Sequence, residues 1–183
     1  MISLRKINSL LIVIVILVLV NHAMLNILGM YGLISYTPDF KITGRRLFYP
    51  LVAHIIISLY LYFSDKRKQI TTYSKLIAET TQQILTGISI IVFAGLHIIT
   101  YIFIPAINQS LSINLIHFII DNLLFISIAL HLRVSIPRLL ISFGFLEGKN
   151  SYKHFKNKLS IIILLILILF IIAEVIFYIG GNL

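Results

Sequence analysis

Five long apolar runs constrain this chain more than any other feature of its sequence. Each run is close to the ~20 residues that a helix needs to cross the hydrocarbon core of a bilayer. Because backbone polar groups find no partner in lipid, each run is predicted to be a helix. The predicted helices cover residues 7–36, 47–64, 82–104, 111–136 and 159–179. We therefore predict an all-α integral membrane protein with five transmembrane helices.

The composition agrees with a single membrane domain over residues 1–183. Hydrophobic residues make up 59% of the chain, charged residues make up 11%, and the mean hydropathy is +1.03. A soluble domain of this size needs far more polar surface. The chain has no cysteine, which excludes disulfides, zinc–thiolate sites and cysteine-ligated iron–sulfur clusters. Water-soluble chemistry is therefore expected from another chain, and we expect no internal repeat in this one.

The basic residues predict how the chain is oriented. Twelve of the 15 lysines and arginines lie in the N-terminal tail, between the second and third runs, or after His131. The positive-inside rule then places the N-terminus inside and the C-terminus outside the membrane. Nucleic acid is not an expected partner, because these residues flank helices and do not form an aromatic-studded groove.

Histidines inside the apolar runs are the main candidates for a functional site. An ionisable side chain at membrane depth is costly, so its presence suggests a function. At ~1.5 Å of rise per residue, His22 and His97 lie roughly 22 Å from the inner ends of their helices. His54 and His131 lie about 15 Å and about 8 Å up, in the inner half. The four histidines thus lie at two depths and come from four helices, an arrangement that suits two cofactors stacked across the membrane.

Haem is the cofactor that best fits this pattern. Haem iron takes neutral imidazole from facing helices on both axial positions, and the apolar macrocycle suits protein at lipid depth. Two haem b groups at two depths would carry electrons across the membrane. Zinc fits less well, because histidines spread over roughly 15 Å of depth cannot share one ion. The alternative is that each histidine only bonds a neighbouring carbonyl oxygen.

Short motifs along the helices resemble one known family of membrane subunits. In "QQILTGISIIVFAGLH", ten residues lead from Gly87 to His97, as in the third helix of the five-helix, di-haem cytochrome b subunit of succinate dehydrogenases and fumarate reductases. The first, second and fourth helices of that family are similar to "NSLLIVIVILVLVNH", "PLVAHIIISLYLYF" and "ISIALHLRVSIPRLLISFG". The similarity covers all five helices.

The resemblance implies the ligands and the partners. Its first and third helices hold an outer haem, which implies His22 with His97. Its second and fourth helices hold an inner haem, which implies His54 with His131. The first four helices would then form a haem-binding bundle. The chain would be an anchor in an energy-transducing membrane, outside the catalytic core. It would pass electrons between membrane quinone and flavoprotein and iron–sulfur subunits on the inner face.

Two departures from the family keep other functions open. The first helix lacks the usual histidine–serine–glycine opening, and Gln82 or Gln83 stands where an arginine is common before the Thr-Gly. One alternative is a cytochrome b anchor of another quinone-linked dehydrogenase or hydrogenase. The alternative from a different class is a haem-free helical scaffold or a transporter component.

His117 is an alternative outer ligand. It lies 14 residues before His131, which places the two rings on one helix face about 21 Å apart, as in bc-type cytochromes b. That family needs a second helix with the same spacing, and the third run has only His97. The bc-type arrangement is therefore disfavoured, while His117 stays open as a replacement for His22 or His97.

Asp121 and Glu174 are the two acids deep in the apolar runs, and both fall in the predicted outer half. We predict a quinol site beside the outer haem, where such a carboxylate accepts the protons released as electrons leave. Asp121 is favoured over Glu174 because it shares a helix with His131. Asp39 in the outer loop is a rival, and a purely structural acid bonded to a hydroxyl or amide is the alternative.

Prolines and tyrosines mark the expected helix ends. Pro137 is expected just beyond the fourth helix, and Pro50 in the first turn of the second, where its missing N–H has little effect. Tyr101 and Tyr178 lie at helix ends and are assigned to the interfacial aromatic belt.

Overall fold

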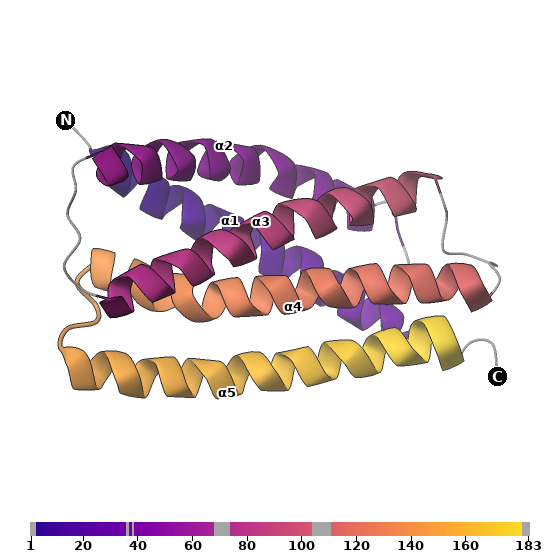
Figure 1. Cartoon of the computed structure of the whole chain (residues 1–183). Helices are drawn as coiled ribbons and strands as arrows, with labels where there is room; N and C mark the ends of the chain where they lie inside the picture. The colour runs from indigo at the N-terminus through magenta and orange to yellow at the C-terminus, as the bar shows by residue number, and fades with distance from the viewer. Residues whose placement is uncertain (1–2, 36, 38, 68–73, 104–110, 181–183) are drawn as a thin grey trace. The chain divides into compact units, whose positions relative to one another are not determined.

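The computed structural model describes residues 3–35, 37, 39–67, 74–103 and 111–180, and within them the regular structure is all helical, without a β-strand (Figure 1). Five α-helices follow one another, and the last continues into a short π-helix. They are α1 (Leu4–Met30), α2 (Asp39–Arg67), α3 (Ser74–Phe103), α4 (Leu111–Ser142), α5 (Lys149–Glu174) and η1 (Val175–Ile179). All five are long and apolar enough to cross a membrane, which confirms the prediction of an all-α chain with five such helices.

The chain consists of two compact units, Met1–Thr72 and Tyr73–Leu183. In the first unit α1 and α2 form an antiparallel hairpin, because Asn8 near the start of α1 contacts Ser58 near the end of α2. In the second unit α4 packs against both α3 and α5, and η1 packs back on α4 (Figure 1). Each unit therefore has its own packing core.

Four of the helices extend beyond the apolar runs that predicted them. α2 begins at Asp39, so Pro50 lies inside the helix and not in its first turn. α4 ends at Ser142, so Pro137 is also internal and not beyond the helix end. Hydropathy identifies only the apolar part of a helix. The helix itself continues through polar turns until a residue with a non-helical backbone conformation ends it. Neighbouring helices let transmembrane helices tolerate such prolines.

Glycines in the left-handed conformation end α1 and α4. Gly32 follows α1 with a φ of 70°, and Leu33 N–H donates to the Leu28 carbonyl oxygen at 2.9 Å. Gly144 follows α4 with a φ of 76°. Glycine adopts this conformation without steric strain and allows the last helical carbonyls to be satisfied. α1 therefore ends at Met30, six residues short of the predicted end.

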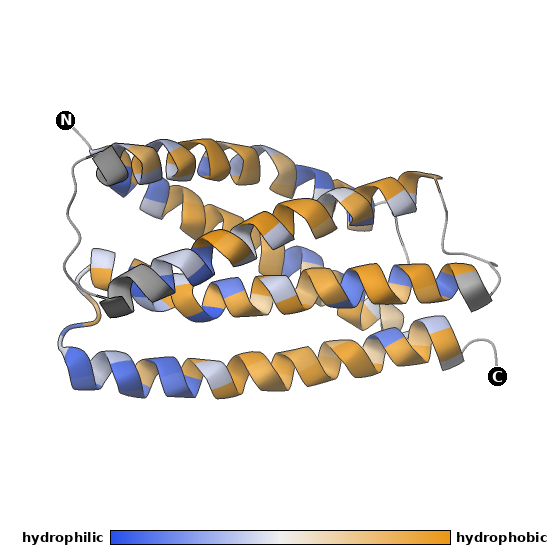
Figure 2. Ribbon diagram, viewed as in Figure 1, coloured by the Kyte–Doolittle hydropathy of each residue, from blue (hydrophilic) through white to orange (hydrophobic). Residues whose placement is uncertain are grey.

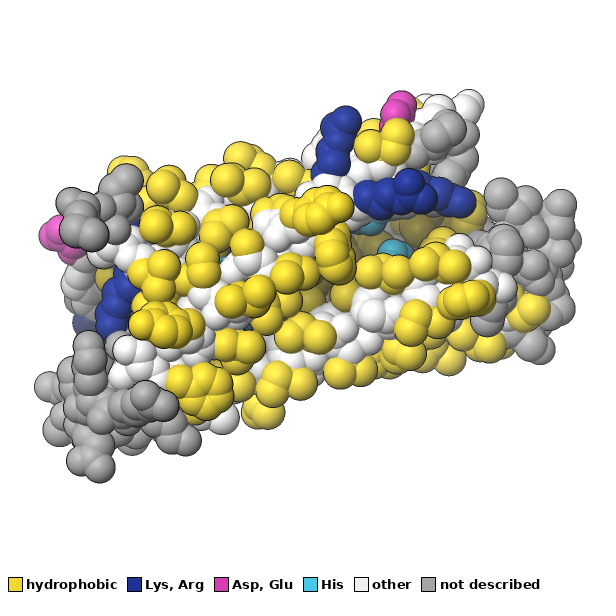
Figure 3. Space-filling model, turned by 90° about the horizontal axis from the view of Figure 1, so that it is seen from above, with side chains coloured by type: hydrophobic (Ala, Val, Ile, Leu, Met, Phe, Trp, Pro, Cys, Tyr) yellow, Lys and Arg dark blue, Asp and Glu magenta, His cyan; other side chains and the backbone are white. Residues whose placement is uncertain are grey.

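Apolar side chains cover much of the face of the molecule that Figure 3 shows. On α5, the polar residues are concentrated in the first turns and apolar residues follow (Figure 2). Ile161, Ile162 and Leu165 of α5 are each more than half exposed. An apolar surface of this kind is unfavourable in water and is solvated by lipid chains in a bilayer. The surface thus agrees with an integral membrane protein.

Candidate functional site

In the first unit, the His22 ring lies against Thr43 of α2. His22 Nδ1 is 3.1 Å from Thr43 Oγ1, and that hydroxyl donates to the Phe40 carbonyl oxygen at 2.8 Å. Because that hydroxyl has one proton, we assign His22 Nδ1–H as the donor to Thr43. Asn26 Nδ2 also lies 3.3 Å from Nδ1, but its shorter bond, 2.7 Å, goes to the His22 carbonyl oxygen. His22 Nε2 therefore carries the ring's lone pair.

The second unit contains the same contact between His131 of α4 and Thr86 of α3. His131 Nδ1 is 3.1 Å from Thr86 Oγ1, and this hydroxyl donates to the Gln82 carbonyl oxygen at 2.8 Å. The single hydroxyl proton is again used, so His131 Nδ1–H is the donor. His131 Nε2 thus carries the lone pair, as in His22.

A glycine follows the threonine in both contacts and faces the same imidazole. A β-carbon built on Gly44 would lie 3.2 Å from His22 Cε1, closer than side chains normally approach. A β-carbon on Gly87 would lie 3.6 Å from His131 Cε1, which is an ordinary contact distance. The first ring therefore occupies space that only glycine leaves open, and the second ring is seated less tightly.

His54 of α2 is held by an amide from α1. Its Nδ1 is 3.0 Å from Asn8 Oδ1 and 3.3 Å from Ser58 Oγ. Asn8 Nδ2 donates to the Ser58 hydroxyl at 3.3 Å, which turns the amide oxygen toward the ring. The amide oxygen can only accept, so Nδ1–H of His54 donates to it.

His97 of α3 is held by a carboxylate from α4. Its Nδ1 lies 2.7 Å from Asp121 Oδ1, and the Asp121 side chain is nearly buried. The Tyr101 hydroxyl donates to Asp121 Oδ2 at 2.9 Å, and the Tyr178 hydroxyl donates to the same oxygen at 3.2 Å. The two tyrosine hydroxyls also contact each other. Asp121 therefore binds one imidazole and two phenols.

Within each unit the two histidines lie at different heights along the helices. Thr43, which contacts His22, precedes His54 by 11 residues on α2, or about 16 Å of helix. The spacing from Thr86 to His97 on α3 is the same. The sequence count predicted only roughly 7 Å between His22 and His54. That count was too small because it measured each histidine from the end of its own apolar run.

The sequence analysis missed a short internal repeat. α2 carries Thr43-Gly44 and then His54, ten residues after the glycine, and α3 carries Thr86-Gly87 and His97 at the same spacing. Each Thr-Gly pair contacts a histidine of the adjacent helix. An alignment of the runs on their Thr-Gly pairs would have revealed the repeat, which the surrounding apolar residues conceal.

Each predicted ligand pair takes one histidine from each unit. The pairs are His22 with His97 and His54 with His131. Contacts within a unit neither join nor separate these pairs, so the pairing stays a prediction. Among the described residues, no three His, Cys, Asp or Glu side chains converge as they would around a single metal ion.

His117 is fully buried among aromatic rings of the second unit. It stacks parallel to the Tyr178 ring with centroids 5.9 Å apart, and the Tyr101 ring lies 4.7 Å away in a tilted arrangement. Tyr178 is 1% exposed, so the prediction that it belongs to a lipid-facing belt is wrong. The Tyr178 hydroxyl donates to the buried Asp121 carboxyl group. Its position near a helix end did not indicate which face of the helix the side chain lies on.

Glu174 is fully buried at the end of α5, immediately before η1. Neither of its carboxyl oxygens has a hydrogen-bond partner within the described part of the chain. It lies close enough to Asp121 for the two carboxyl groups to interact electrostatically. A buried polar group without a partner is rare and requires an explanation. Asp39, the rival acid, is exposed in the first turn of α2.

Arg138 of α4 contacts the part of α3 that precedes its Thr-Gly pair. Its Nη1 donates to Gln83 Oε1 at 2.7 Å, and its Nη2 donates to Thr80 Oγ1 at 3.1 Å. Gln83 Nε2 in turn donates to Ser135 Oγ at 3.0 Å. A guanidinium thus lies one turn before the Thr-Gly pair, although it comes from another helix.

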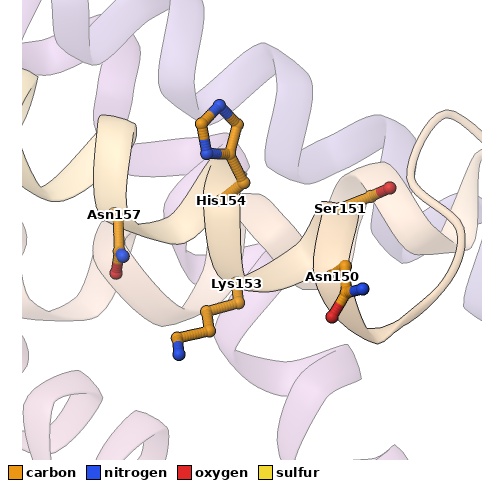
Figure 4. Close-up of a pocket in the computed structure, with 5 residues that line it drawn as sticks. All are labelled: Asn150, Ser151, Lys153, His154 and Asn157. Carbon is orange, nitrogen blue, oxygen red and sulfur yellow. The ribbon is translucent and has the colours of Figure 1, made fainter.

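A shallow polar hollow at the start of α5 contains none of the predicted site residues (Figure 4). His154 and Lys153 point away from one another in this view, and their side chains do not converge on a common point (Figure 4). The residues that line the hollow are Asn150, Ser151, Lys153, His154 and Asn157.

Comparisons with known protein families, with curated proteins and with solved structures found no match to this chain. Its function is therefore argued from the residues of the two units.

Proposed function

We propose that the chain is a di-haem b membrane anchor that exchanges electrons between membrane quinone and a soluble partner holding a flavin and iron–sulfur clusters, of the succinate dehydrogenase or fumarate reductase type. His22 and His97 bind one haem. His54 and His131 bind the other. The N-terminus lies inside, and the partner binds the inner face, where twelve basic residues gather.

The state of the four imidazoles carries this proposal. In each ring Nδ1–H is held by an acceptor: Thr43, Asn8, Asp121 or Thr86. With Nδ1–H donating in this way, Nε2 is the nitrogen of each ring that would bind iron. Metal-binding histidines have this arrangement, because the second nitrogen donates to a neighbour that fixes the tautomer and the ring plane. Bound haem would supply one-electron redox chemistry at each level.

The glycines support the same role. Gly44 and Gly87 both face an imidazole ring at a helix–helix contact, and at Gly44 an added β-carbon would crowd the ring. A histidine that only fills space does not need the same threonine and glycine neighbours in both units. The same Thr-Gly contact holds one ring in each unit, which points to a requirement shared by both units.

Arg138 supports the likeness to the cytochrome b family. Gln83 departs from the arginine that is common before the Thr-Gly, and this departure weakened the resemblance. Because Arg138 bonds Gln83, a positive charge is retained beside the Thr86 contact with His131.

A quinol site in the predicted outer half completes the proposal, and Glu174 is its proton acceptor. The sequence favoured Asp121 for this role. However, Asp121 already accepts bonds from His97, Tyr101 and Tyr178. Among the described residues, both carboxyl oxygens of Glu174 lack a hydrogen-bond partner, so Glu174 can take up a proton without giving up an existing bond.

Optical spectra of the purified full-length chain test the proposal. A reduced-minus-oxidised spectrum should contain b-type bands, and a pyridine haemochrome assay should give two haem b per chain. The rival from another class is a haem-free transporter component, which the buried carboxyl pair of Asp121 and Glu174 favours. Membrane preparations with abundant protein and no b-type absorbance would support that rival and overturn the proposal.

A further inference from the structure

The two hairpins differ at one corresponding position. α2 and α3 each carry Thr-Gly and a histidine ten residues after the glycine. In both, a side chain from the adjacent helix accepts from Nδ1 of that histidine. For His54 the acceptor is the neutral amide of Asn8, at 3.0 Å. For His97 it is the carboxylate of Asp121, at 2.7 Å. The repeat thus places an amide in one unit where the other has an acid.

The Asp121 carboxyl group accepts hydrogen bonds from three side chains. Its Oδ1 takes the His97 Nδ1–H, and its Oδ2 takes the hydroxyl protons of Tyr101 and Tyr178. It is 5% exposed, so little solvent screens its interaction with the imidazole. Hydrogen bonds to a carboxylate are shorter and about twice as strong as those between neutral groups. The short His97 contact therefore polarises the ring far more than Asn8 polarises His54.

We propose that Asp121 is a positioning residue that makes His97 a stronger electron donor to iron than His54. This inference rests on the proposed function. A carboxylate on Nδ1 raises the basicity of Nε2, as outer partners of metal-bound histidine do. A more basic ligand, together with a nearby negative charge, stabilises ferric iron over ferrous iron. The haem held by His97 is consequently harder to reduce than it would be with a neutral partner on that ring.

Reciprocal variants of the full-length, haem-loaded protein test this inference. Asp121→Asn copies the neutral amide of the first unit, and Asn8→Asp copies the carboxylate of the second. Potentiometric titration, followed at the b-type absorbance, measures both haem midpoint potentials. Asp121→Asn should raise one potential by a tenfold or greater shift in the ferrous-to-ferric ratio, equal to about 59 mV for one electron. Asn8→Asp should lower the midpoint potential of the other haem by a similar number of millivolts.

Asn122→Asp is the matched control for charge alone. Asn122 neighbours Asp121 on α4, and its amide donates to the Phe118 carbonyl oxygen at 2.7 Å. A carboxylate there adds a charge beside Asp121 without a contact to His97, so it should shift the potential of that haem by less than half of the opposite shift that Asp121→Asn causes. An equal effect would show that any nearby charge suffices and would overturn the positioning role.

The outcomes separate this inference from the proposed function. If the wild-type chain binds no haem, the proposed function fails. If it binds two haems and neither reciprocal variant shifts a potential, the proposed function stands and the role of Asp121 is overturned. If Asp121→Asn does not assemble with haem, Asn8→Asp decides: a lowered potential supports the inference, and an unchanged one overturns it.

Discussion

Gly44 of α2 faces the His22 ring of α1 so closely that a β-carbon would lie 3.2 Å from Cε1. The imidazole has little freedom to retreat, because Thr43 also holds its Nδ1. The corresponding glycine of the second unit, Gly87, leaves 3.6 Å to His131. The two hairpins therefore share one arrangement but differ in how strictly they require glycine.

This difference predicts unequal effects of alanine at the two glycines. Gly44→Ala should displace the His22 ring and destabilise the first unit by about 1–3 kcal/mol, as overpacking does elsewhere. It should also remove most of one haem, measured by pyridine haemochrome. Gly87→Ala should keep both haems, because its new methyl group meets His131 at an ordinary distance. Gly95→Ala, with nothing within 4 Å of the added carbon, is the control. Equal haem loss at Gly44 and Gly87 would contradict the geometry.

Alanine at the four histidines tests the ligand pairs. His22→Ala and His97→Ala should each remove the same haem and leave the other. His54→Ala and His131→Ala should do the reverse, because each iron loses one axial ligand. Haem content and the midpoint potential of the remaining haem are the measurements. If His117→Ala removes a haem while His22→Ala keeps both, then His117 is the outer ligand instead.

Glutamine at Glu174 tests the proton acceptor. Glu174→Gln keeps the shape of the side chain but removes its ability to take a proton, so quinol turnover should fall about 10²-fold or more. Both haem spectra should be unchanged, since no histidine bonds Glu174 in the described structure. The measurement is quinol-dependent haem reduction by stopped flow. Reduction at the wild-type rate would remove Glu174 from the quinol site.

An ion pair joins α5 to the start of α3. Lys156 Nζ lies 2.7 Å from Glu79 Oε1, and the Tyr152 hydroxyl donates to Glu79 Oε2 at 2.9 Å. Both charged side chains are largely shielded from solvent, so the pair should contribute more than an exposed one. Glu79→Gln should destabilise the protein by about 1–3 kcal/mol.

Thermal unfolding of the detergent-solubilised chain measures this effect, and Tm should fall for Glu79→Gln and for Lys156→Met. The double variant should lose less than the sum of the two, because the partners are coupled. Lys153→Met, an exposed lysine on the same turns of α5, is the control and should leave Tm unchanged. Strictly additive losses would show that the ion pair does not stabilise the fold.

The sequence by itself determined the five helices and their suitability for crossing a membrane. Length and hydropathy are local properties, so the apolar runs predict five helices, and these runs also place His22, His54, His97 and His131 inside them. Helix ends were less well predicted, because α2 and α4 continue into polar turns through Pro50 and Pro137. The stops at Gly32 and Gly144 depend on backbone conformation, which hydropathy does not report.

Only the tertiary structure decided which side chain each imidazole contacts. The proton of His22 goes to Thr43, 21 residues away, and that of His97 goes to Asp121, 24 residues away. Such partners meet only when two helices pack at a particular height and rotation. The rotation of the C-terminal helix about its axis also explains why Tyr178, predicted at the membrane interface, is buried and donates to Asp121. A helix has one sequence but several faces, and only packing against a neighbour selects the face that is buried.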